Sequence, residues 1–307
     1  MITVVIPTIG RASLADAVPA GVPVIVVEDT ERRGPAAARN KGWRQARTPW
    51  VVFLDDDVVP AEGWLEAVVK DLADLPEDVG GSQGRIEVPL PEGRRPTDAE
   101  RNTAGLADAD WITADMAYRR SALEKVGGFD ERFPRAYRED ADLALRVMAA
   151  GFRLVKGERV TRHPVRDDGF WASVRFQRGN ADDALMRRIH GPGWRSLIGA
   201  GGLLPRHAVT AVLGLSAVAL AVAAAGKGGG GATRGAARKG GSARNRAAGA
   251  ALLAGTGWAA LTARFAWERI APGPRTPAEI VRMLVTSVAI PPVACLHRLR
   301  GELRERW

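Results

Sequence analysis

The chain has 307 residues, of which 46% are hydrophobic, and this length and composition suit a globular protein with a sizeable core. Its formal net charge is +9, but residues 1–204 carry a net charge of −2 and residues 205–307 a net charge of +11. Because the basic excess lies outside the part predicted to form the main fold, a nucleic-acid-binding domain is not expected, whereas contact with anionic lipid is. With a single cysteine, Cys295, the chain cannot form an intrachain disulfide, which is typical of a reducing compartment.

The first half of the chain alternates between short apolar strands and helices. It begins MITVVIPTIGR, which has neither a charged leader nor a long apolar run, so we expect a first strand and no signal peptide. The predicted strands are 2–7, 23–27 and 50–54, and the predicted helices are 13–18, 36–46 and 61–74. This order favours an α/β fold with a mixed, mostly parallel sheet flanked by helices.

The second half of this region is less regular. Residues 89–107 are polar and rich in proline and glycine, which predicts a long surface loop able to act as a lid. Beyond it the pattern predicts strands at 110–118 and within 152–160, and helices at 121–126, 140–150 and 170–190.

The composition changes after Pro205. Residues 208–226 and 247–263 contain no charged side chain, while residues 227–246 between them hold six Lys or Arg and many glycines, which predicts a flexible loop. A third apolar run, 280–296, is interrupted by Arg282 and Pro291-Pro292. We therefore expect a folded domain over 1–204 and a helical, basic, membrane-associated tail over 205–307.

The topology of this tail is left open by the sequence. At a rise of about 1.5 Å per residue, the two uncharged runs are near the lower limit for crossing a bilayer. A crossing hairpin would put the basic loop 227–246 outside, against the positive-inside tendency, whereas helices lying in the interface would keep it cytosolic. The short runs and low leucine content favour the interface slightly, and two buried helices of a soluble second domain are the remaining interpretation.

Acidic residues follow two of the predicted strands. Glu28-Asp29 ends the strand 23–27, and Asp55–Asp57 ends the strand 50–54, at the edge where ligands bind in parallel sheets. Three adjacent carboxylates need a compensating cation, and their oxygens suit Mg²⁺ or Mn²⁺, with Asp55 and Asp57 as the natural pair. Such an ion can bridge the phosphates of a nucleotide diphosphate. The alternative is an acidic turn that caps the next helix.

Six segments, in this order and spacing, resemble the family 2 glycosyltransferases over residues 2–165. This resemblance implies the GT-A fold, a Rossmann-like α/β architecture, and inverting transfer from a nucleotide-diphosphate sugar, with a divalent metal (Mn²⁺ or Mg²⁺) as cofactor. The segments are VVIPT (4–8), VVEDT (26–30), GPAAARNKG (34–42), VVFLDDDVVP (51–60), GGFDERF (127–133) and REDADLALR (138–146).

The resemblance also implies roles for individual residues. Asp140 aligns with the catalytic base of inverting members, which removes the proton of the acceptor hydroxyl. Asp55 and Asp57 correspond to the DXD motif, with His163 as a further metal or diphosphate contact. The expected nucleotide-sugar-binding residues are Thr8, Glu28, Asp29, Arg39, Asn40, Asp55 and Asp56, and the residues expected to face the acceptor are Trp111, Asp115, Arg138 and Glu139.

We therefore expect a glycosyltransferase at the cytoplasmic face of the cell membrane that uses a nucleotide-diphosphate sugar, with uridine diphosphate the commonest carrier in the family. The apolar tail suggests a lipid-linked or cell-envelope acceptor. A nucleotidyltransferase would also use strand-end carboxylates, but the segment PTIGRAS lacks the lysine and length of its phosphate loop. An inactive, membrane-tethered nucleotide-binding protein would have no need for Asp140.

Overall fold

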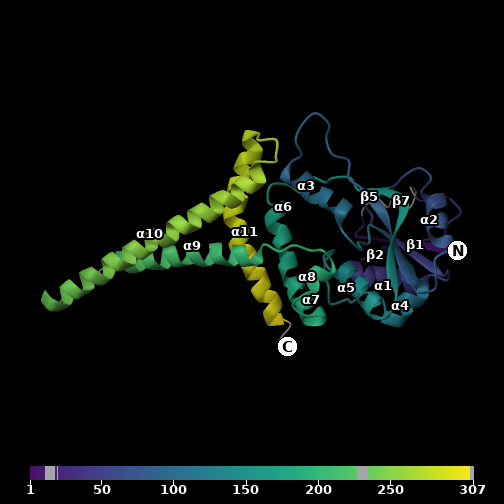
Figure 1. Ribbon diagram of the computed structural model, residues 1–307, viewed down its shortest axis with the longest axis horizontal. Coiled ribbons are helices and arrows are strands. Elements are labelled where there is room, and N and C mark those ends of the chain that lie inside the picture. The colour runs from purple at the N-terminus through teal and green to yellow at the C-terminus, as the bar shows by residue number, and fades with distance from the viewer. Residues whose placement is uncertain (11–17, 19, 227–233, 305–307) are drawn as a thin grey trace. The chain divides into compact units, whose positions relative to one another are not determined.

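The computed structural model describes residues 1–10, 18, 20–226 and 234–304 (Figure 1). These residues form two compact units. The first comprises Met1–Asp168 and Asp182–Gly201, and the second Gly169–Ala181 and Gly202–Trp307. The division expected after residue 204 thus differs in one respect, since residues 169–181 belong to the second unit.

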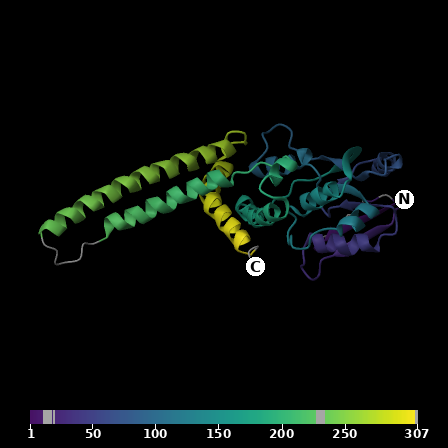
Figure 2. The same cartoon turned by 60° about the horizontal axis from the view of Figure 1, so that its bottom comes forward.

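The first unit is built on a mixed sheet with helices on its faces (Figures 1 and 2). In the described residues the sheet has seven strands in the order β2-β1-β3-β6-β5-β7-β4. The pairs β1–β2, β1–β3 and β5–β7 are parallel, whereas β3–β6, β5–β6 and β4–β7 are antiparallel. The strands are β1 (Ile2–Thr8), β2 (Val24–Glu28), β3 (Trp50–Leu54), β4 (Val59–Pro60), β5 (Val79–Glu87), β6 (Asp115–Arg119) and β7 (Arg153–Arg162).

The helices of this unit follow the predicted apolar patterns closely. Trp64, Val68 and Leu72, spaced four apart, form the buried face of α2. The predicted helix 13–18 falls outside the described residues except for Val18. The helices are α1 (Pro35–Gln45), α2 (Trp64–Ala73), α3 (Asp98–Ala104), α4 (Arg120–Val126), α5 (Glu139–Ala149), α7 (Asp182–His190) and α8 (Trp194–Leu197).

Two glycines allow close packing of α1, one against the sheet and one against the segment that precedes α5. A side chain at Gly42 would meet Val5 and Val27, and Gly34, with φ of 97°, lies against the backbone of Pro134. Pro35 then begins the helix, a position where its missing N–H costs nothing. This close packing brings the helix residues next to the ends of β1 and β3.

Two segments of this unit differ from the prediction. Strand β5 was not foreseen, because its sequence VGGSQGRIE is rich in glycine. Those glycines are required by close packing, since a side chain at Gly81 would collide with Met116 and Leu154. The predicted loop 89–107 contains helix α3, whose start is stabilised by a capping box between Thr97 and Glu100.

The second unit is helical. Two long antiparallel helices, α9 and α10, lie side by side, and Gly214 allows close contact with Trp258 (Figure 2). The third long helix, α11, contacts both and also packs on residues 169–181, where Arg282 donates to the carbonyl of Gly169 at 2.8 Å. The elements are α6 (Ala172–Arg175), the 3₁₀ helix η3 (Phe176–Ala181), α9 (Leu204–Ala225), α10 (Arg234–Ile270) and α11 (Pro277–Arg304).

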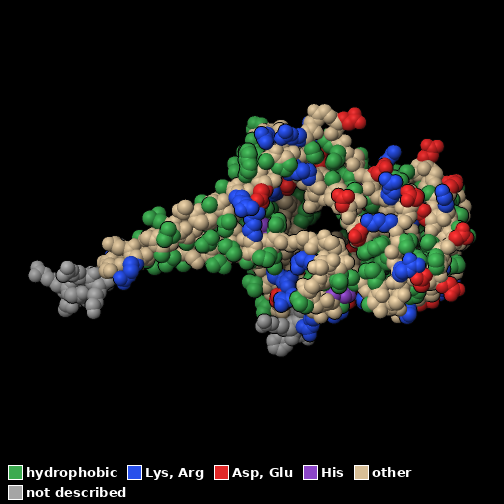
Figure 3. Space-filling view, in the orientation of Figure 1, with side chains coloured by type: hydrophobic (Ala, Val, Ile, Leu, Met, Phe, Trp, Pro, Cys, Tyr) green, Lys and Arg blue, Asp and Glu red, His purple; other side chains and the backbone are tan. Residues whose placement is uncertain are grey.

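Among the described residues, α9 and α11 are the helices long and apolar enough to cross a membrane. Figure 3 shows hydrophobic side chains along the surface of α9 and α10. Five apolar residues along α9 have more than half of their surface exposed: Val209, Val212, Leu215, Val218 and Val222. An exposed apolar face of this length requires a covering environment.

The tail differs from the prediction in one respect. Residues 234–246 belong to α10 instead of a flexible loop; residues 227–233 fall outside the described part. The apolar run 280–296 lies within α11, and the helix continues through Arg282 and Pro291-Pro292, which interrupt the run in sequence. Residues 247–263 lie in the middle of α10, as a part of a longer helix.

Candidate active site

The candidate site lies where β1, β2 and β3 end. Because the three strands are parallel, their carboxyl ends meet at one edge of the sheet, which places Thr8, Glu28 and the acidic triplet Asp55–Asp57 together. Thr8 donates to Asp56 at 2.7 Å, which joins the end of β1 to the triplet. Parallel strand ends are the usual ligand edge of such sheets.

Arg39 connects this edge to helix α5. Its guanidinium donates to Asp55 at 2.7 Å and to Glu139 at 2.8 Å, while its side chain is only 2% exposed. Burial opposes its charge, but the two carboxylates together hold the pKa of Arg39 above its usual value. The expected role of Arg39 in lining the nucleotide pocket is therefore replaced by a positioning role, since its terminal nitrogens are engaged by these two acids.

The first turn of α5 carries two adjacent acids. Glu139 is buried, and burial together with the neighbouring Asp140 raises its pKa. Burial also raises the pKa of Asp140, whose carboxylate accepts from the backbone of Ala141 at 2.7 Å; the field of Asp55 adds to this shift, and Arg39 and Arg138 oppose it. A raised pKa suits a proton acceptor.

Arg138 holds the start of α5 in place. Its φ of 78° lies in the left-handed region, which is uncommon for a residue with a side chain. The guanidinium donates to Asp183 of α7 at 3.0 Å and lies 4.4 Å from the centre of the Tyr137 ring. These contacts fix the backbone just before Asp140, and whether Arg138 also faces an acceptor remains a prediction.

Asp57 is surrounded by basic groups. The Nε2 atom of His163 lies 3.6 Å from its Oδ2 atom, and Arg166 forms an ion pair with the same oxygen. Arg166 also lies 3.8 Å from Asp56. Burial and the nearby Asp55 raise the pKa of Asp57, and the two basic side chains oppose the shift. The structure therefore places His163 beside Asp57, and its role as a metal or diphosphate contact, which the resemblance implied, stays a prediction.

Glu28 and Asp29 border a cavity of about 450 Å³ between the end of β2 and α1. Asp29 accepts from the backbone of Arg33 at 2.8 Å and of Gly34 at 2.7 Å, which shapes the turn before α1. The carboxylate of Glu28 lies against Gly10. Both acids are accessible to a ligand, and their nucleotide-binding role remains a prediction.

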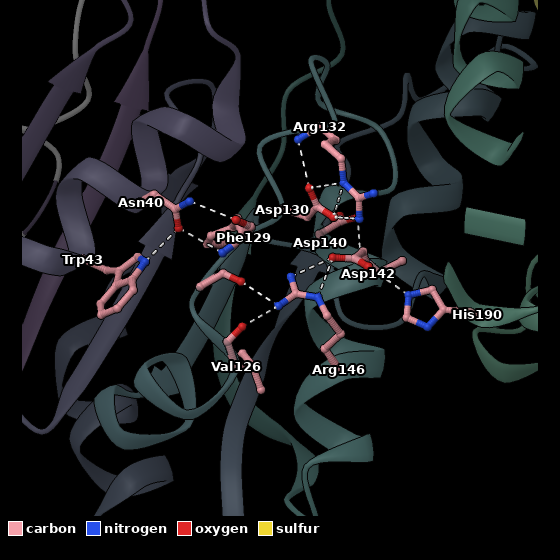
Figure 4. Close-up of polar contacts among 12 residues, drawn as sticks. Asn40, Trp43, Val126, Phe129, Asp130, Arg132, Asp140, Asp142, Arg146 and His190 are labelled. Atoms are coloured by element: carbon pink, nitrogen blue, oxygen red, sulfur yellow. Dashed lines mark hydrogen bonds and ion pairs between the residues drawn. The ribbon is translucent and has the colours of Figure 1, made fainter. Parts of the chain in front are cut away.

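Asn40 does not face a ligand. It is 1% exposed, and its amide oxygen accepts from the backbone of Phe129 and from Trp43, each at 2.9 Å (Figure 4). Its amide nitrogen donates to the carbonyl of Phe129 and to Glu131, again at 2.9 Å each. The prediction that Asn40 lines the nucleotide pocket is wrong, because the buried side chain directs its hydrogen bonds to Trp43 of α1 and to Phe129 and Glu131.

A second set of hydrogen bonds, made by Asp142 and Arg146, holds α5 in place. Asp142 is fully buried and accepts from Arg146 at 2.7 Å and from His190 at 2.9 Å (Figure 4). Arg146 also donates to the carbonyls of Val126 and Gly128. These contacts anchor the helix whose first turn presents Asp140, and Asp142 itself is not available to a substrate.

The prediction that Asp115 faces an acceptor is also wrong. Asp115 is fully buried and accepts from Trp64 at 2.7 Å, Arg159 at 2.7 Å and Thr161 at 2.6 Å. Three donors satisfy its charge within the core, where an unpaired carboxylate would be costly. Trp111, half-buried, has φ of 64°, and its backbone donates to Gln83; its acceptor-side role stays a prediction.

The known proteins that this chain resembles in sequence and structure are glycosyltransferases. Residues 11–131 match the family described as Glycosyl transferase family 2. The Pre-mycofactocin glycosyltransferase of Mycobacterium tuberculosis is 35% identical over 153 residues, 45% of this chain and 32% of the relative. Glycosyltransferase AglE of Haloferax volcanii is 28% identical over 180 residues, 54% of this chain and 58% of the relative. The chain thus spans about a third of the first relative and under two thirds of the second.

Among solved structures, the mannosyltransferase PcManGT from Pyrobaculum calidifontis, in complex with GDP-Man and Mn²⁺, is similar in fold. Its TM-score is 0.52 at 23% identity, and the alignment covers 97% of this chain and 86% of that chain. The mixed sheet and this likeness show the GT-A fold. The match of residues 11–131 to the family 2 glycosyltransferases agrees with the resemblance seen in the sequence.

Proposed function

We propose that this chain is an inverting glycosyltransferase that moves a sugar from a nucleotide-diphosphate donor to an acceptor hydroxyl. The observation that supports it most is the Arg39 bridge, which joins Asp55 at the end of β3 to Glu139 at the start of α5. The bridge keeps the donor-side acids and Asp140 within one electrostatic network. Transfer needs both, since one group must stabilise the leaving diphosphate while another removes a proton.

In this proposal Asp140 accepts the proton of the acceptor hydroxyl as its oxygen attacks the anomeric carbon. Its raised pKa makes it a stronger base than an exposed aspartate, and the charges of Arg39 and Arg138 limit the rise. Glu139 does not reach the substrate but, with Arg39, holds the first turn of α5 against the sheet. The positive end of the α5 dipole further stabilises the negative charge of Asp140.

The residues at the triplet fit a divalent cofactor. The guanidinium of Arg166 already lies beside Asp56 and Asp57, so these carboxylates attract positive charge. No three His, Cys, Asp or Glu side chains within the described ranges form a metal cluster by themselves. Asp55 and Asp57 would hold the ion, which would supply positive charge to the leaving diphosphate; His163, whose Nε2 atom lies 3.6 Å from Asp57, stays a predicted further contact.

The donor is identified by incubating purified protein with UDP- and GDP-sugars in Mn²⁺ or Mg²⁺. We expect release of the nucleoside diphosphate from one class of donor; PcManGT was solved with GDP-Man. A coupled assay that detects UDP and GDP measures this release. No turnover of any nucleotide sugar, with any metal, would contradict the proposed activity.

We propose further that α9 inserts into the membrane, with the catalytic unit on the cytoplasmic face and a lipid-linked or envelope glycan as acceptor. Helix α9 is about 33 Å long, enough to cross a hydrocarbon core of about 30 Å. Residues 208–226 carry no charge on any face, whereas a helix lying in the interface needs a polar face.

This insertion predicts that the full chain stays in the membrane pellet after extraction at pH 11 and leaves it only with detergent. The double variant Leu215→Arg, Val218→Arg places two charges in the exposed apolar face of α9, each costing about 2.5–3.5 kcal/mol at a helix centre, and should shift the protein out of the pellet. Val69→Arg, at an exposed apolar position of α2, is the matched control and should pellet as the wild type does. Wild type released by the alkaline wash would contradict insertion.

A further inference from the structure

The acidic triplet is balanced by two different arginines. Arg39 forms ion pairs with Asp55 and Glu139. A different cation is therefore needed to neutralise Asp56 and Asp57. Arg166 takes this place, with an ion pair to Asp57 and a distance of 3.8 Å to Asp56. Three adjacent carboxylates without a second positive charge would repel one another.

The same oxygen of Asp57 is the natural ligand of a divalent ion. Its Oδ2 atom faces Arg166 and also lies 3.6 Å from the Nε2 atom of His163. An ion bound to that oxygen, at about 2.1 Å, would lie where the guanidinium now makes its contact. Because two positive charges at this distance repel, ion and guanidinium cannot share the oxygen.

Arg166 is in a position to move. Residues 163–169 form neither helix nor strand, and the side chain of Arg166 is 34% exposed. In contrast, Arg39 extends from the middle of α1 and is almost fully buried. Rotation of the Arg166 side chain would therefore break no helical or strand hydrogen bond.

We propose that Arg166 is an exchangeable cation: it neutralises Asp56 and Asp57 in the metal-free protein, is displaced from Asp57 by the divalent ion, and then binds the diphosphate of the donor. The planar guanidinium forms paired hydrogen bonds with phosphate oxygens, so the displaced side chain has a partner beside the ion. Metal and donor would thus bind in a coupled way, with the metal freeing the group that holds the phosphates. This inference rests on the proposed function, since it requires that the triplet bind an ion and a diphosphate.

The exchange predicts opposite effects of one substitution on two ligands. Arg166→Gln removes the competing cation, so Mn²⁺ alone should bind about fivefold tighter or more, as measured by the free-ion EPR signal. In saturating Mn²⁺, the same variant should bind UDP or GDP about tenfold more weakly by calorimetry, because the phosphate contact is lost. Arg166→Lys retains the charge without the planar fork, and should restore wild-type Mn²⁺ affinity but only part of the nucleotide affinity.

Arg162→Gln is the matched control, because Arg162 is an exposed arginine of β7 whose ion-pair partner is Glu87, 3.7 Å away. It should leave both affinities unchanged. Equal or weaker Mn²⁺ binding by Arg166→Gln than by the wild type would overturn the exchange while leaving the proposed function intact. Nucleotide binding that needs Arg166 but no metal would overturn it too, since Arg166 would then be a fixed cation. If no form binds Mn²⁺, both the exchange and the proposed metal site fail.

Discussion

Replacing Asp140 with asparagine is expected to abolish sugar transfer while leaving nucleotide binding unchanged. The substitution keeps the size of the side chain and its position on the first turn of α5, but removes the group that accepts the proton. Proton transfer by a positioned base contributes roughly 10²–10⁴-fold to a rate, so kcat should fall by that factor. Nucleoside diphosphate release under saturating donor and acceptor measures the loss, and calorimetry with UDP or GDP shows whether the donor site persists.

Asp78→Asn provides the control for this experiment, because Asp78 is an exposed aspartate whose ion pair with Arg153 lies outside the candidate site. It should have wild-type kcat. Full activity in Asp140→Asn would show that Asp140 is not the base. Another group would then have to accept the proton of the acceptor hydroxyl.

The pH dependence of wild-type activity should also show that Asp140 acts as the base. A base works in its deprotonated form, so activity falls as the pH drops below its pKa. Because burial and the neighbouring Asp55 raise the pKa of Asp140, the acid limb of kcat/KM should lie at higher pH than an ordinary aspartate would give. In Asp140→Asn this limb should disappear from the residual activity.

Replacing Asp57 with asparagine should remove the dependence on divalent metal. Asp57 is the carboxylate closest to both His163 and Arg166, and its charge is needed to hold an ion against the diphosphate. Metal stabilisation of a leaving group is worth several kcal/mol, so Mn²⁺-stimulated turnover should fall by about 10²–10³-fold. The assay compares nucleotide release with and without Mn²⁺.

The fold should survive this substitution, because Asp57 lies after β3 and contributes no strand pairing. Thermal unfolding of Asp57→Asn should therefore resemble that of the wild type. Glu158→Gln, at a site 81% exposed, is the control for loss of an acidic residue elsewhere in the unit. Retention of full metal-stimulated turnover by Asp57→Asn would exclude the triplet as the metal site.

The position of the acidic edge could be predicted from the sequence because it depends on local patterns. Apolar runs at β1, β2 and β3 define parallel strands, and the acids that end two of them must then lie at one edge. The start of α5 was predicted within one residue for the same reason, since an amphipathic pattern follows Glu139-Asp140.

What could not be predicted depends on contacts between distant segments. Asp115 reaches its partners Trp64, Arg159 and Thr161 only through the pairing of β6 with its neighbours. Asn40 likewise forms a hydrogen bond with the backbone of Phe129, which is 89 residues away. A motif match places such residues near the site but does not show whether their polar atoms face the ligand or the core.

Arg166 illustrates the opposite case, a residue with a proposed role that sequence reasoning missed. It lies three residues after His163 in a segment without periodicity, so no helix or strand pattern marks it. The one available signal was the need of three adjacent carboxylates for a compensating cation. That need suggested a metal ion, and the structure shows that Arg166 of the chain itself also supplies a positive charge at the triplet.

The central claim is that an ion held at the end of β3 and a base at the start of α5 act on one bound nucleotide sugar. Nucleoside diphosphate release by the purified wild type, measured after EDTA treatment and again after Mn²⁺ or Mg²⁺ is restored, tests it most directly. We predict negligible release in EDTA and recovery on adding back the metal, with no recovery in Asp57→Asn or Asp140→Asn. Turnover that is unaffected by EDTA and by both substitutions would contradict the account.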